Sequence, residues 1–373
     1  MDFDKIINKK KKDLIHKRHG GEIYKKKIFK GKSEIIDFSI NINPLNASNK
    51  YSEWFKESLS EIQKYPDSES LILKERLVSY FSNRIKLENI IIGAGSMELI
   101  TNFCDIFIEP NDNIIISQPT FSEYEWAIRK NLGDIINIPR DLQNNFKLEK
   151  HPIMSRIDPQ TKAIFICNPN NPNGNLENFN DIEEIIKFSL DRNILVFLDE
   201  AFIEFTGEEN SFINKINKYK NLFVSRSFTK FFGIPGLRIG FGVGDLVLIK
   251  HMKKAQNLWS VNCIGQKFAE KMLYYNNFIK SSISFVNKER NFLISELSRI
   301  PKLKLFTTRT NFILINIENT GIRSHELKKI LLEKNILIRD CSNFKYLDNY
   351  YIRISVKDRE SNIKLIQTLK SII

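Results

Sequence analysis

The chain has 373 residues, a length that predicts two domains rather than one. Hydrophobic residues make up 42% of it and charged residues 27%, the balance of a soluble globular protein with a sizeable core. No apolar run approaches the ~18 residues of a membrane span, and the N-terminus lacks the apolar stretch of a secretory signal. The four cysteines lie far apart without a Cys-x-x-Cys spacing, which argues against a disulfide framework or a structural zinc site. We therefore expect a cytoplasmic protein with no membrane segment and no metal site.

The net charge of +13 comes from 57 Lys and Arg against 44 Asp and Glu. Residues 1–32 hold 12 basic and 4 acidic residues, a net of +8, so the other 341 residues carry only +5. A charge of this size admits nucleic acid or an anionic membrane as a partner, but most of the excess sits in one terminal segment. We therefore expect a basic, irregular N-terminal arm over residues 1–45, with neither nucleic acid nor a membrane as partner.

Short apolar runs alternate with helix-length segments through residues 46–262. Strands are expected at 89–92, 113–117, 163–167, 194–198, 222–225 and 239–243, with helices such as 97–107 and 182–192 between them. Near-continuous apolar strands that alternate with helices predict an α/β domain with a mostly parallel, covered sheet. Residues 263–373 predict a smaller α+β domain, with a long helix at 268–297 and strands at 312–317, 336–339 and 351–356.

The strongest motif is Ser227-Phe228-Thr229-Lys230, which Arg238 follows eight residues after the lysine. A lysine held against aromatic neighbours is desolvated, which lowers its pKa and frees the neutral amine to attack a carbonyl carbon. The two hydroxyl groups and the arginine suit a phosphate dianion, which they would bind by charge-assisted hydrogen bonds. An ordinary surface lysine and arginine beside a turn would explain the same string.

Three further elements lie at other strand ends. Asn171 belongs to the Asn/Pro/Gly-rich segment 168–174, at the edge where an open α/β sheet binds ligands. Asp199 ends a strand, and its carboxylate is suited to pair with a protonated ring nitrogen. Gly95 and Ser96 open a helix, whose free backbone N–H groups suit a phosphate. Each element alone could be a loop, a cap or a turn. The prediction of a ligand site rests on their occurring together in this order and at this spacing.

These motifs resemble the fold-type I pyridoxal-phosphate enzymes of the aspartate aminotransferase superfamily, from about Asp37 to the C-terminus. The resemblance implies an α/β fold with a mostly parallel seven-stranded sheet in the large domain and a smaller α+β C-terminal domain. It also implies pyridoxal 5′-phosphate as the cofactor and a homodimer. The cofactor contacts that it implies are Tyr65, Gly95, Ser96, Phe121, Asn171, Asp199, Ser227, Thr229, Lys230 and Arg238.

Each of these contacts has a role in the family. By resemblance, Lys230 forms the covalent link to the cofactor, Asp199 pairs with the pyridine nitrogen, and Asn171 hydrogen-bonds the phenolic oxygen O3′. Phe121 lies over the cofactor face, and Tyr65 reaches the phosphate bound by the partner subunit. The remaining residues hold the phosphate.

One position departs from the aminotransferase pattern. Three residues after Asp199, where aminotransferase relatives carry a tyrosine that donates a second hydrogen bond to O3′, this chain has Phe202. Loss of that donor should raise the pKa of the link between lysine and cofactor.

Strings at 19–21, 37–45 and 338–344 are similar to the threonine-phosphate decarboxylases of cobalamin biosynthesis, and Phe202 fits that branch. The resemblance implies conversion of L-threonine O-3-phosphate into (R)-1-amino-2-propanol O-2-phosphate and carbon dioxide. It implies catalysis by Lys230 and Asp199. The substrate contacts that it implies are His19, Asn41, Asn171, Arg339 and Arg353.

Three alternatives stay open. Histidinol-phosphate aminotransferase shares the Asn-Pro-Asn-Asn-Pro loop, the Arg-Asp string and the C-terminal arginine, but it lacks His-Gly-Gly. A decarboxylase for serine phosphate would differ only by one methyl group in its substrate, worth ~1–3 kcal/mol in a pocket. A DNA-bound regulator would need a helix-turn-helix domain, for which the first 45 residues are too short and irregular. The residues also leave open which arginine holds the phosphate and which the carboxylate.

Overall fold

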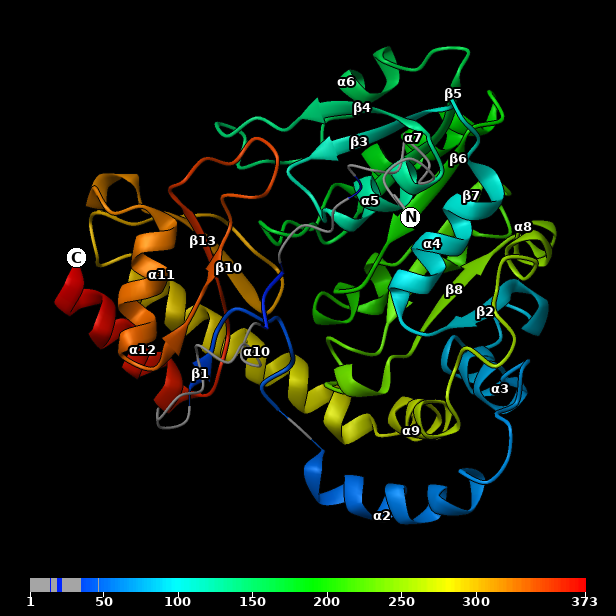
Figure 1. The fold of residues 1–373 in the computed structure, drawn as a ribbon, viewed down its shortest axis with the longest axis horizontal. Coiled ribbons are helices and arrows are strands. Elements are labelled where there is room, and N and C mark those ends of the chain that lie inside the picture. The colour runs from blue at the N-terminus through cyan, green and yellow to red at the C-terminus, as the bar shows by residue number, and fades with distance from the viewer. Residues whose placement is uncertain (1–13, 15–18, 22–34, 46) are drawn as a thin grey trace, which may run out of the picture.

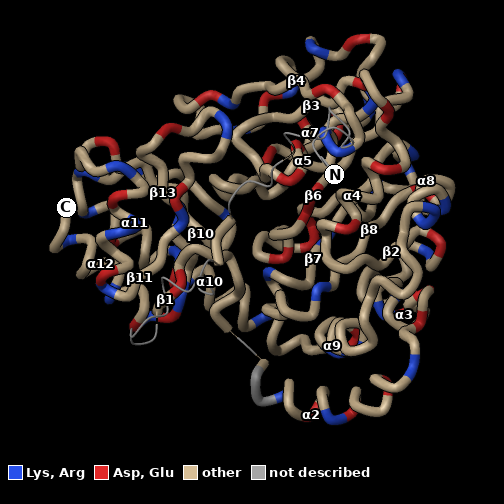
Figure 2. The backbone as a smooth tube through the Cα atoms, in the orientation of Figure 1, with Lys and Arg blue, Asp and Glu red and all other residues tan. Residues whose placement is uncertain are grey.

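The structure is a computed structural model that describes residues 14, 19–21, 35–45 and 47–373. Most of the basic segment predicted as an arm, including its lysine cluster, lies outside the described residues. Along the rest of the chain, Lys and Arg are interspersed with Asp and Glu (Figure 2). No helix of the described part is long and apolar enough to cross a membrane.

A sheet of seven strands forms the centre of the larger part of the described chain (Figure 1). In spatial order its strands are β2 (Ile90–Gly93), β8 (Gly240–Gly244), β7 (Leu222–Ser227), β6 (Leu195–Asp199), β5 (Thr161–Cys167), β3 (Asn113–Gln118) and β4 (Asp134–Pro139). Strands pair in parallel except β8, which is antiparallel to both neighbours. The prediction of an α/β fold with a mostly parallel seven-stranded sheet is therefore confirmed.

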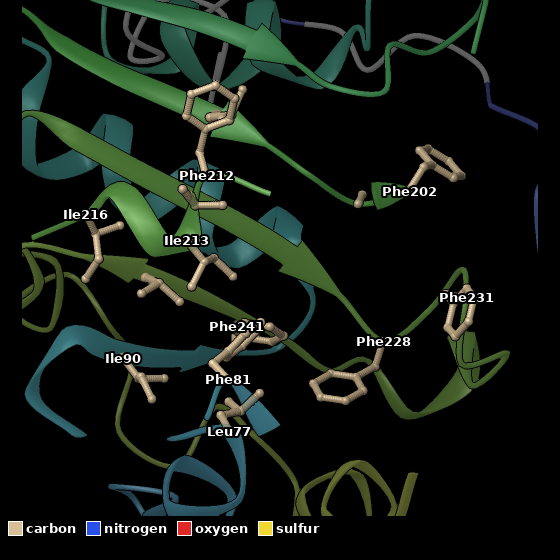
Figure 3. Close-up of a cluster of buried hydrophobic side chains, with 14 of the residues drawn as sticks. Leu77, Phe81, Ile90, Phe202, Phe212, Ile213, Ile216, Phe228, Phe231 and Phe241 are labelled. Atoms are coloured by element: carbon tan, nitrogen blue, oxygen red, sulfur yellow. The ribbon is translucent and has the colours of Figure 1, made fainter. Parts of the chain in front are cut away.

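Helices cover both faces of this sheet, as buried β-branched strands require (Figure 1). One face packs against α4 (Ser96–Phe107), α5 (Glu123–Lys130) and α8 (Leu246–Met252). The other packs against α2 (Ser48–Ser58), α3 (Leu71–Tyr80), α6 (Lys150–Ser155), α7 (Phe179–Leu190) and α9 (Cys263–Leu273). Figure 3 shows that this second core runs from Leu77 on α3 to Phe202 and Phe231, so packed aromatic rings support the strand ends.

The C-terminal part contains a smaller antiparallel sheet with the order β12-β13-β10-β9. Its strands are β9 (Lys304–Leu305), β10 (Phe312–Asn316), β12 (Arg339–Asp340) and β13 (Tyr351–Ser355). The helices α10 (Asn276–Leu297), α11 (Ser324–Glu333) and α12 (Arg359–Ile372) pack against it. The predicted division at residues 262 and 263 stays a prediction; α9, which begins there, packs beside the large sheet.

The end of the predicted arm belongs to the smaller part of the fold. Strand β1 (Ile36–Asp37) pairs in parallel with β11 (Ile336–Leu337). The backbone of Phe38 then continues this pairing, since its N–H donates to Leu337 and its carbonyl accepts from Ser355. The segment that follows β1 therefore enters the space between the two sheets along a fixed path.

A buried ion cluster lies behind the ends of β6 and β7. Arg226 on β7 is fully buried, and its guanidinium donates to the carboxylates of Glu200, Glu204 and Glu208 at 2.8 to 3.1 Å. Glu200 and Glu204 are buried, one cation cannot neutralise three carboxylates, and one oxygen of Glu204 has no hydrogen-bond partner within the described chain. Burial raises the pKa of Glu204 to about 7, although Arg226 opposes the shift. Glu204 therefore holds a proton up to about neutral pH.

The proton on Glu204 predicts a stability that falls as the pH rises. The folded protein keeps this proton up to about pH 7, whereas the unfolded chain releases it near pH 4.5. The stabilisation is therefore complete at acidic pH and is lost as the pH passes 7, by roughly 3 kcal/mol in total. Glu204→Gln should remove this slope in urea unfolding measured from about pH 5 to about pH 8. The exposed control Glu209→Gln should keep the slope, and identical profiles for Glu204→Gln and wild type would contradict the assignment.

Candidate active site

A cavity of about 500 Å³ lies at the carboxyl ends of the parallel strands, between the two sheets. Its walls are formed by His19, Gly20, Ser39, Ile40, Asn41, Ser96, Met97, Phe121, Glu123, Cys167, Asn171, Asp199, Ala201, Phe202, Lys230, Arg238, Arg339, Phe344 and Arg353. This is the edge at which open α/β sheets bind ligands. Every site residue predicted from the sequence lines this cavity except Gly95, Ser227, Thr229 and Tyr65.

Lys230 follows β7 and carries the amine of the cavity. Its pKa is lowered to about 8, first by burial and then by the positive charges of Arg353 and Arg238, against the opposing charge of Asp199. The backbone of the lysine is fixed by Asn43, whose N–H donates to the Lys230 carbonyl at 2.9 Å. The amine is therefore partly neutral near physiological pH and is held in a defined place.

Asp199 ends β6 at the floor of the cavity and is 3% exposed. Burial raises the pKa of its carboxyl group. Two donors oppose that shift, because Tyr124 donates its hydroxyl to Oδ2 at 2.6 Å and the Ala201 N–H donates to Oδ1 at 3.0 Å. The sequence did not reveal Tyr124, which lies three residues after Phe121 and packs its ring edge-on against it. Tyr124 thus orients the Asp199 carboxylate and also supports the Phe121 ring in the cavity wall.

A cradle for a phosphate lies at the N-terminus of α4. Gly95 is its N-cap with φ +82°, and a Cβ there would lie 2.7 Å from Nη2 of Arg238. Ser227 and Thr229 lie behind the cavity wall, with their hydroxyl oxygens 2.7 Å apart. Gly240 pairs with Ser227, and a Cβ on it would lie 2.9 Å from the backbone nitrogen of Ser96. Glycine at these positions lets the helix N-terminus, the hydroxyl pair and the arginine meet.

Two arginines face the cavity from adjacent strands of the smaller sheet. Arg353 on β13 is buried and donates to the side-chain oxygen of Asn171 and, at 3.2 Å, to the carbonyl of Ser39. Arg339 on β12 lies opposite Arg353 in register and donates to Asn343 at 2.7 Å. Burial lowers the pKa of Arg353 to about 10, which still leaves it charged at neutral pH. Arg353 of the small sheet therefore joins the Asn171 side chain, which follows β5 of the large sheet, to the backbone of the arm at Ser39.

The remaining predicted residues divide between the cavity and the surface. His19 and Asn41 line the cavity, and the amide oxygen of Asn41 is buried without a hydrogen-bond partner in the described part of the chain. Phe202 also lines it and packs edge-on against Phe312 at 5.0 Å. Tyr65 is 77% exposed and stacks on Trp259 at 4.3 Å. Its predicted contact requires a second subunit and stays a prediction.

These residues fit pyridoxal phosphate. The amine of Lys230 has no hydrogen-bond or ion-pair partner among the described residues, so it is available to an aldehyde. Asp199 offers an oriented carboxylate for a ring nitrogen, Phe121 an aromatic wall, and Asn171 an amide. The helix N-terminus with Arg238 offers a site for a phosphate dianion.

The lowered pKa of Lys230 predicts the pH at which an apoenzyme captures pyridoxal phosphate. The neutral amine is the nucleophile, so the rate of capture should rise with pH and level off above about 8 rather than above 10.5. Stopped-flow absorbance measures this rate directly, and Lys230→Ala, which should show no capture, is the control. A rate that still climbs beyond about pH 9 would show that the amine is not desolvated.

The hydrogen bond from Tyr124 predicts weaker cofactor binding in Tyr124→Phe. This variant keeps the ring but removes the donor that favours the charged form of Asp199, so affinity for pyridoxal phosphate should fall about tenfold. Fluorescence titration of the apoenzyme measures the affinity. Tyr219→Phe, whose hydroxyl donates to Glu183 instead, is the matched control and should bind normally. Unchanged affinity in Tyr124→Phe would mean that the bond to Asp199 does not support the cofactor.

Comparisons with known proteins agree with this geometry. Residues 33–369 match the family described as "Aminotransferase class I and II". A histidinol-phosphate aminotransferase from Methanosphaera stadtmanae is 34% identical over 91% of this chain and 90% of its own length. A provisionally named threonine-phosphate decarboxylase from Caldanaerobacter subterraneus subsp. tengcongensis is 35% identical over 89% of each chain.

The crystal structure of a histidinol-phosphate aminotransferase from Clostridium acetobutylicum has a TM-score of 0.83 to this chain at 33% identity. The similarity covers 90% of this chain and 98% of that one. Both sequence and fold are therefore shared over nearly the whole length. The chain belongs to the aminotransferase class I and II family, and it is a pyridoxal-phosphate-dependent enzyme.

Proposed function

We propose that the enzyme decarboxylates L-threonine O-3-phosphate and so forms (R)-1-amino-2-propanol O-2-phosphate for the nucleotide loop of cobalamin. Relatives named for this activity and for histidinol-phosphate aminotransferase both reach 34 to 35% identity, although most of the similar proteins carry the aminotransferase name. The choice between them therefore rests on the cavity.

The charges of the cavity support a substrate with two anionic groups. With Arg238 assigned to the cofactor phosphate, Arg339 and Arg353 remain as cations in the opposite wall. L-Threonine O-3-phosphate carries a carboxylate and a phosphate on adjacent carbons, one for each arginine. Histidinol phosphate carries a phosphate but no carboxylate, so its single anionic group would match only one of the two arginines.

Phe202 is the observation that favours the decarboxylase over the aminotransferase. Its side chain lines the cavity, is 4% exposed, and is held against Phe312. It supplies no hydroxyl where aminotransferase relatives carry a tyrosine. The same arginines would also accommodate the two carboxylates of 2-oxoglutarate, so the charge of the cavity alone does not exclude an aminotransferase. The absence of the tyrosine hydroxyl at position 202 is what argues against an aminotransferase.

The residues of the cavity have separate tasks in this reaction. Pyridoxal phosphate held by Lys230, Asp199 and Arg238 would supply an electron sink for the substrate Cα bond that stands perpendicular to the ring. Arg353 and Arg339 orient the substrate so that the bond to the carboxylate takes that direction. The Asp199 carboxylate, held by Tyr124, keeps a proton on the ring nitrogen. After carbon dioxide leaves, Nζ of Lys230 returns a proton to Cα.

A homodimer completes the proposal. The Tyr65 ring is exposed, stacks on Trp259 and does not line its own cavity, so it is free to contact a second chain. In this assembly Tyr65 contributes to the phosphate site of the partner subunit.

Release of carbon dioxide tests the function. Incubation with carboxyl-labelled L-threonine O-3-phosphate and no keto acid should release labelled carbon dioxide, and L-serine O-phosphate should react more slowly. Histidinol phosphate with 2-oxoglutarate should yield no glutamate. Arg353→Gln should lower kcat/KM by about a hundredfold or more, because it leaves one anionic group of the substrate without its cation. Glutamate formation without carbon dioxide would overturn the proposal in favour of the aminotransferase.

A further inference from the structure

The turn between β2 and α4, which leads into the phosphate cradle, uses its own backbone donors. Gly95, the N-cap of α4, donates its N–H to the carbonyl of Gly93 at 2.7 Å. The N–H of Ala94, one residue earlier, donates to Oε2 of Glu98 at 2.6 Å. Both donors that precede the helix therefore have partners within this part of the chain. The N–H groups of the first turn of α4, which lack intrahelical partners, are the ones left for a phosphate.

Glu98 accepts hydrogen bonds from two directions. Its Oε2 accepts from the N–H of Ala94 and, at 3.1 Å, from the hydroxyl of Ser260, which lies 162 positions along the chain. Close to Ser260 in sequence, Gln256 donates its side-chain amide to the carbonyl of Ile92 on β2. The turn is therefore tied at two points to one distant segment, and Glu98 makes one of these two ties.

The charge of Glu98 opposes the binding of a phosphate. Glu98 holds the residue beside the Gly95 N-cap, so its carboxylate lies in the same turn as the cradle. A carboxylate there repels a phosphate dianion and weakens its binding. Any favourable contribution of Glu98 to the site is therefore geometric, through the backbone that it holds.

The cradle tolerates little displacement. A Cβ on Gly95 would lie 2.7 Å from Nη2 of Arg238, so backbone and guanidinium are in close contact. A Cβ on Gly240 would lie 2.9 Å from the backbone nitrogen of Ser96, so β8 limits the turn as well. Movement of Ala94 would therefore displace Gly95 from Arg238 and widen the phosphate site.

We propose that Glu98 is the positioning residue of the phosphate cradle, and that Ser260 holds it where it anchors Ala94. The anchor keeps the N-terminus of α4 and Arg238 at a fixed spacing, so no binding energy is spent on ordering the turn. Glu98 acts through the backbone and does not itself touch the phosphate. The proposal rests on the assignment of this cradle to the cofactor phosphate and is independent of which substrate the enzyme uses.

An ordinary helix cap is the alternative role for Glu98. A glutamate at the third position of a helix often reaches back to a backbone N–H, which stabilises the helix without serving a ligand. Glu326 is such a residue, because it is the third residue of α11 and accepts from the N–H of Arg323 at 2.9 Å. Glu326 does not line the cavity. It therefore provides a matched control with the same side chain at the same helix position.

Pyridoxal, which lacks the phosphate, separates the two roles. Fluorescence titration of the apoenzyme with pyridoxal phosphate and with pyridoxal measures both affinities without any substrate. Glu98→Ala should weaken pyridoxal phosphate about tenfold and leave pyridoxal unchanged, because only the phosphate uses the cradle. Glu98→Gln keeps an acceptor and should stay within about threefold of wild type. Glu326→Ala should lower the melting temperature and change neither affinity.

The result that would overturn the positioning role is a Glu98→Ala protein, folded by circular dichroism, that binds both ligands as wild type does. An equal loss of affinity for both ligands would overturn it too, because a role in the cradle acts only on the phosphate. Neither result depends on the reaction that the holoenzyme catalyses.

Ser260 provides a second test that leaves α4 itself unchanged. Ser260→Ala removes one hydrogen bond to Glu98 and should weaken pyridoxal phosphate about threefold, again with pyridoxal unchanged. Ser260→Thr keeps the hydroxyl and should bind like wild type. The double variant with Glu98→Ala should bind no more weakly than Glu98→Ala alone, because both residues act through one anchor. Additive losses would show that Ser260 does not act through Glu98 and would overturn this part of the proposal.

Discussion

Burial of a lysine amine among like charges is the constraint on which this site depends. Lys230 lies near Arg353 and Arg238, and Asp199 is the opposing charge that acts on it. Cations removed from water are costly unless anions accompany them. The cavity therefore suits negatively charged ligands. The same excess of positive charge that lowers the pKa of Lys230 attracts a phosphate.

The fold places these charges by bringing three distant segments to one edge. Parallel strands deliver Asn171, Asp199 and Lys230 at their carboxyl ends, as open α/β sheets do. The small sheet delivers Arg339 and Arg353 from strands β12 and β13. Residues after β1 enter between the two sheets, so a substrate in the cavity would touch all three parts. Aromatic packing and the Arg226 cluster support the strand ends from behind.

The sequence predicted the residues whose positions follow from local structure. Lys230, Asp199 and Gly95 each lie at a strand end or a βα turn, where the chemistry needed leaves a short, recognisable string. Tyr124 was missed because its role arises only in three dimensions. The hydrogen bond from Tyr124 to Asp199 spans 75 positions, and that from His19 to Glu123 spans 104. No spacing in the sequence predicts such contacts, because they depend on how strands and helices pack.

One lysine among many must bind the cofactor. Reduction of the holoenzyme with borohydride fixes the cofactor on its lysine as a stable pyridoxyl group, and peptide mass spectrometry then locates that group. The burial and lowered pKa of Lys230 predict a single modified peptide that contains Lys230. A pyridoxyl group on any other lysine, in an enzyme that retains its visible absorbance, would contradict the assignment of the cavity as the active site.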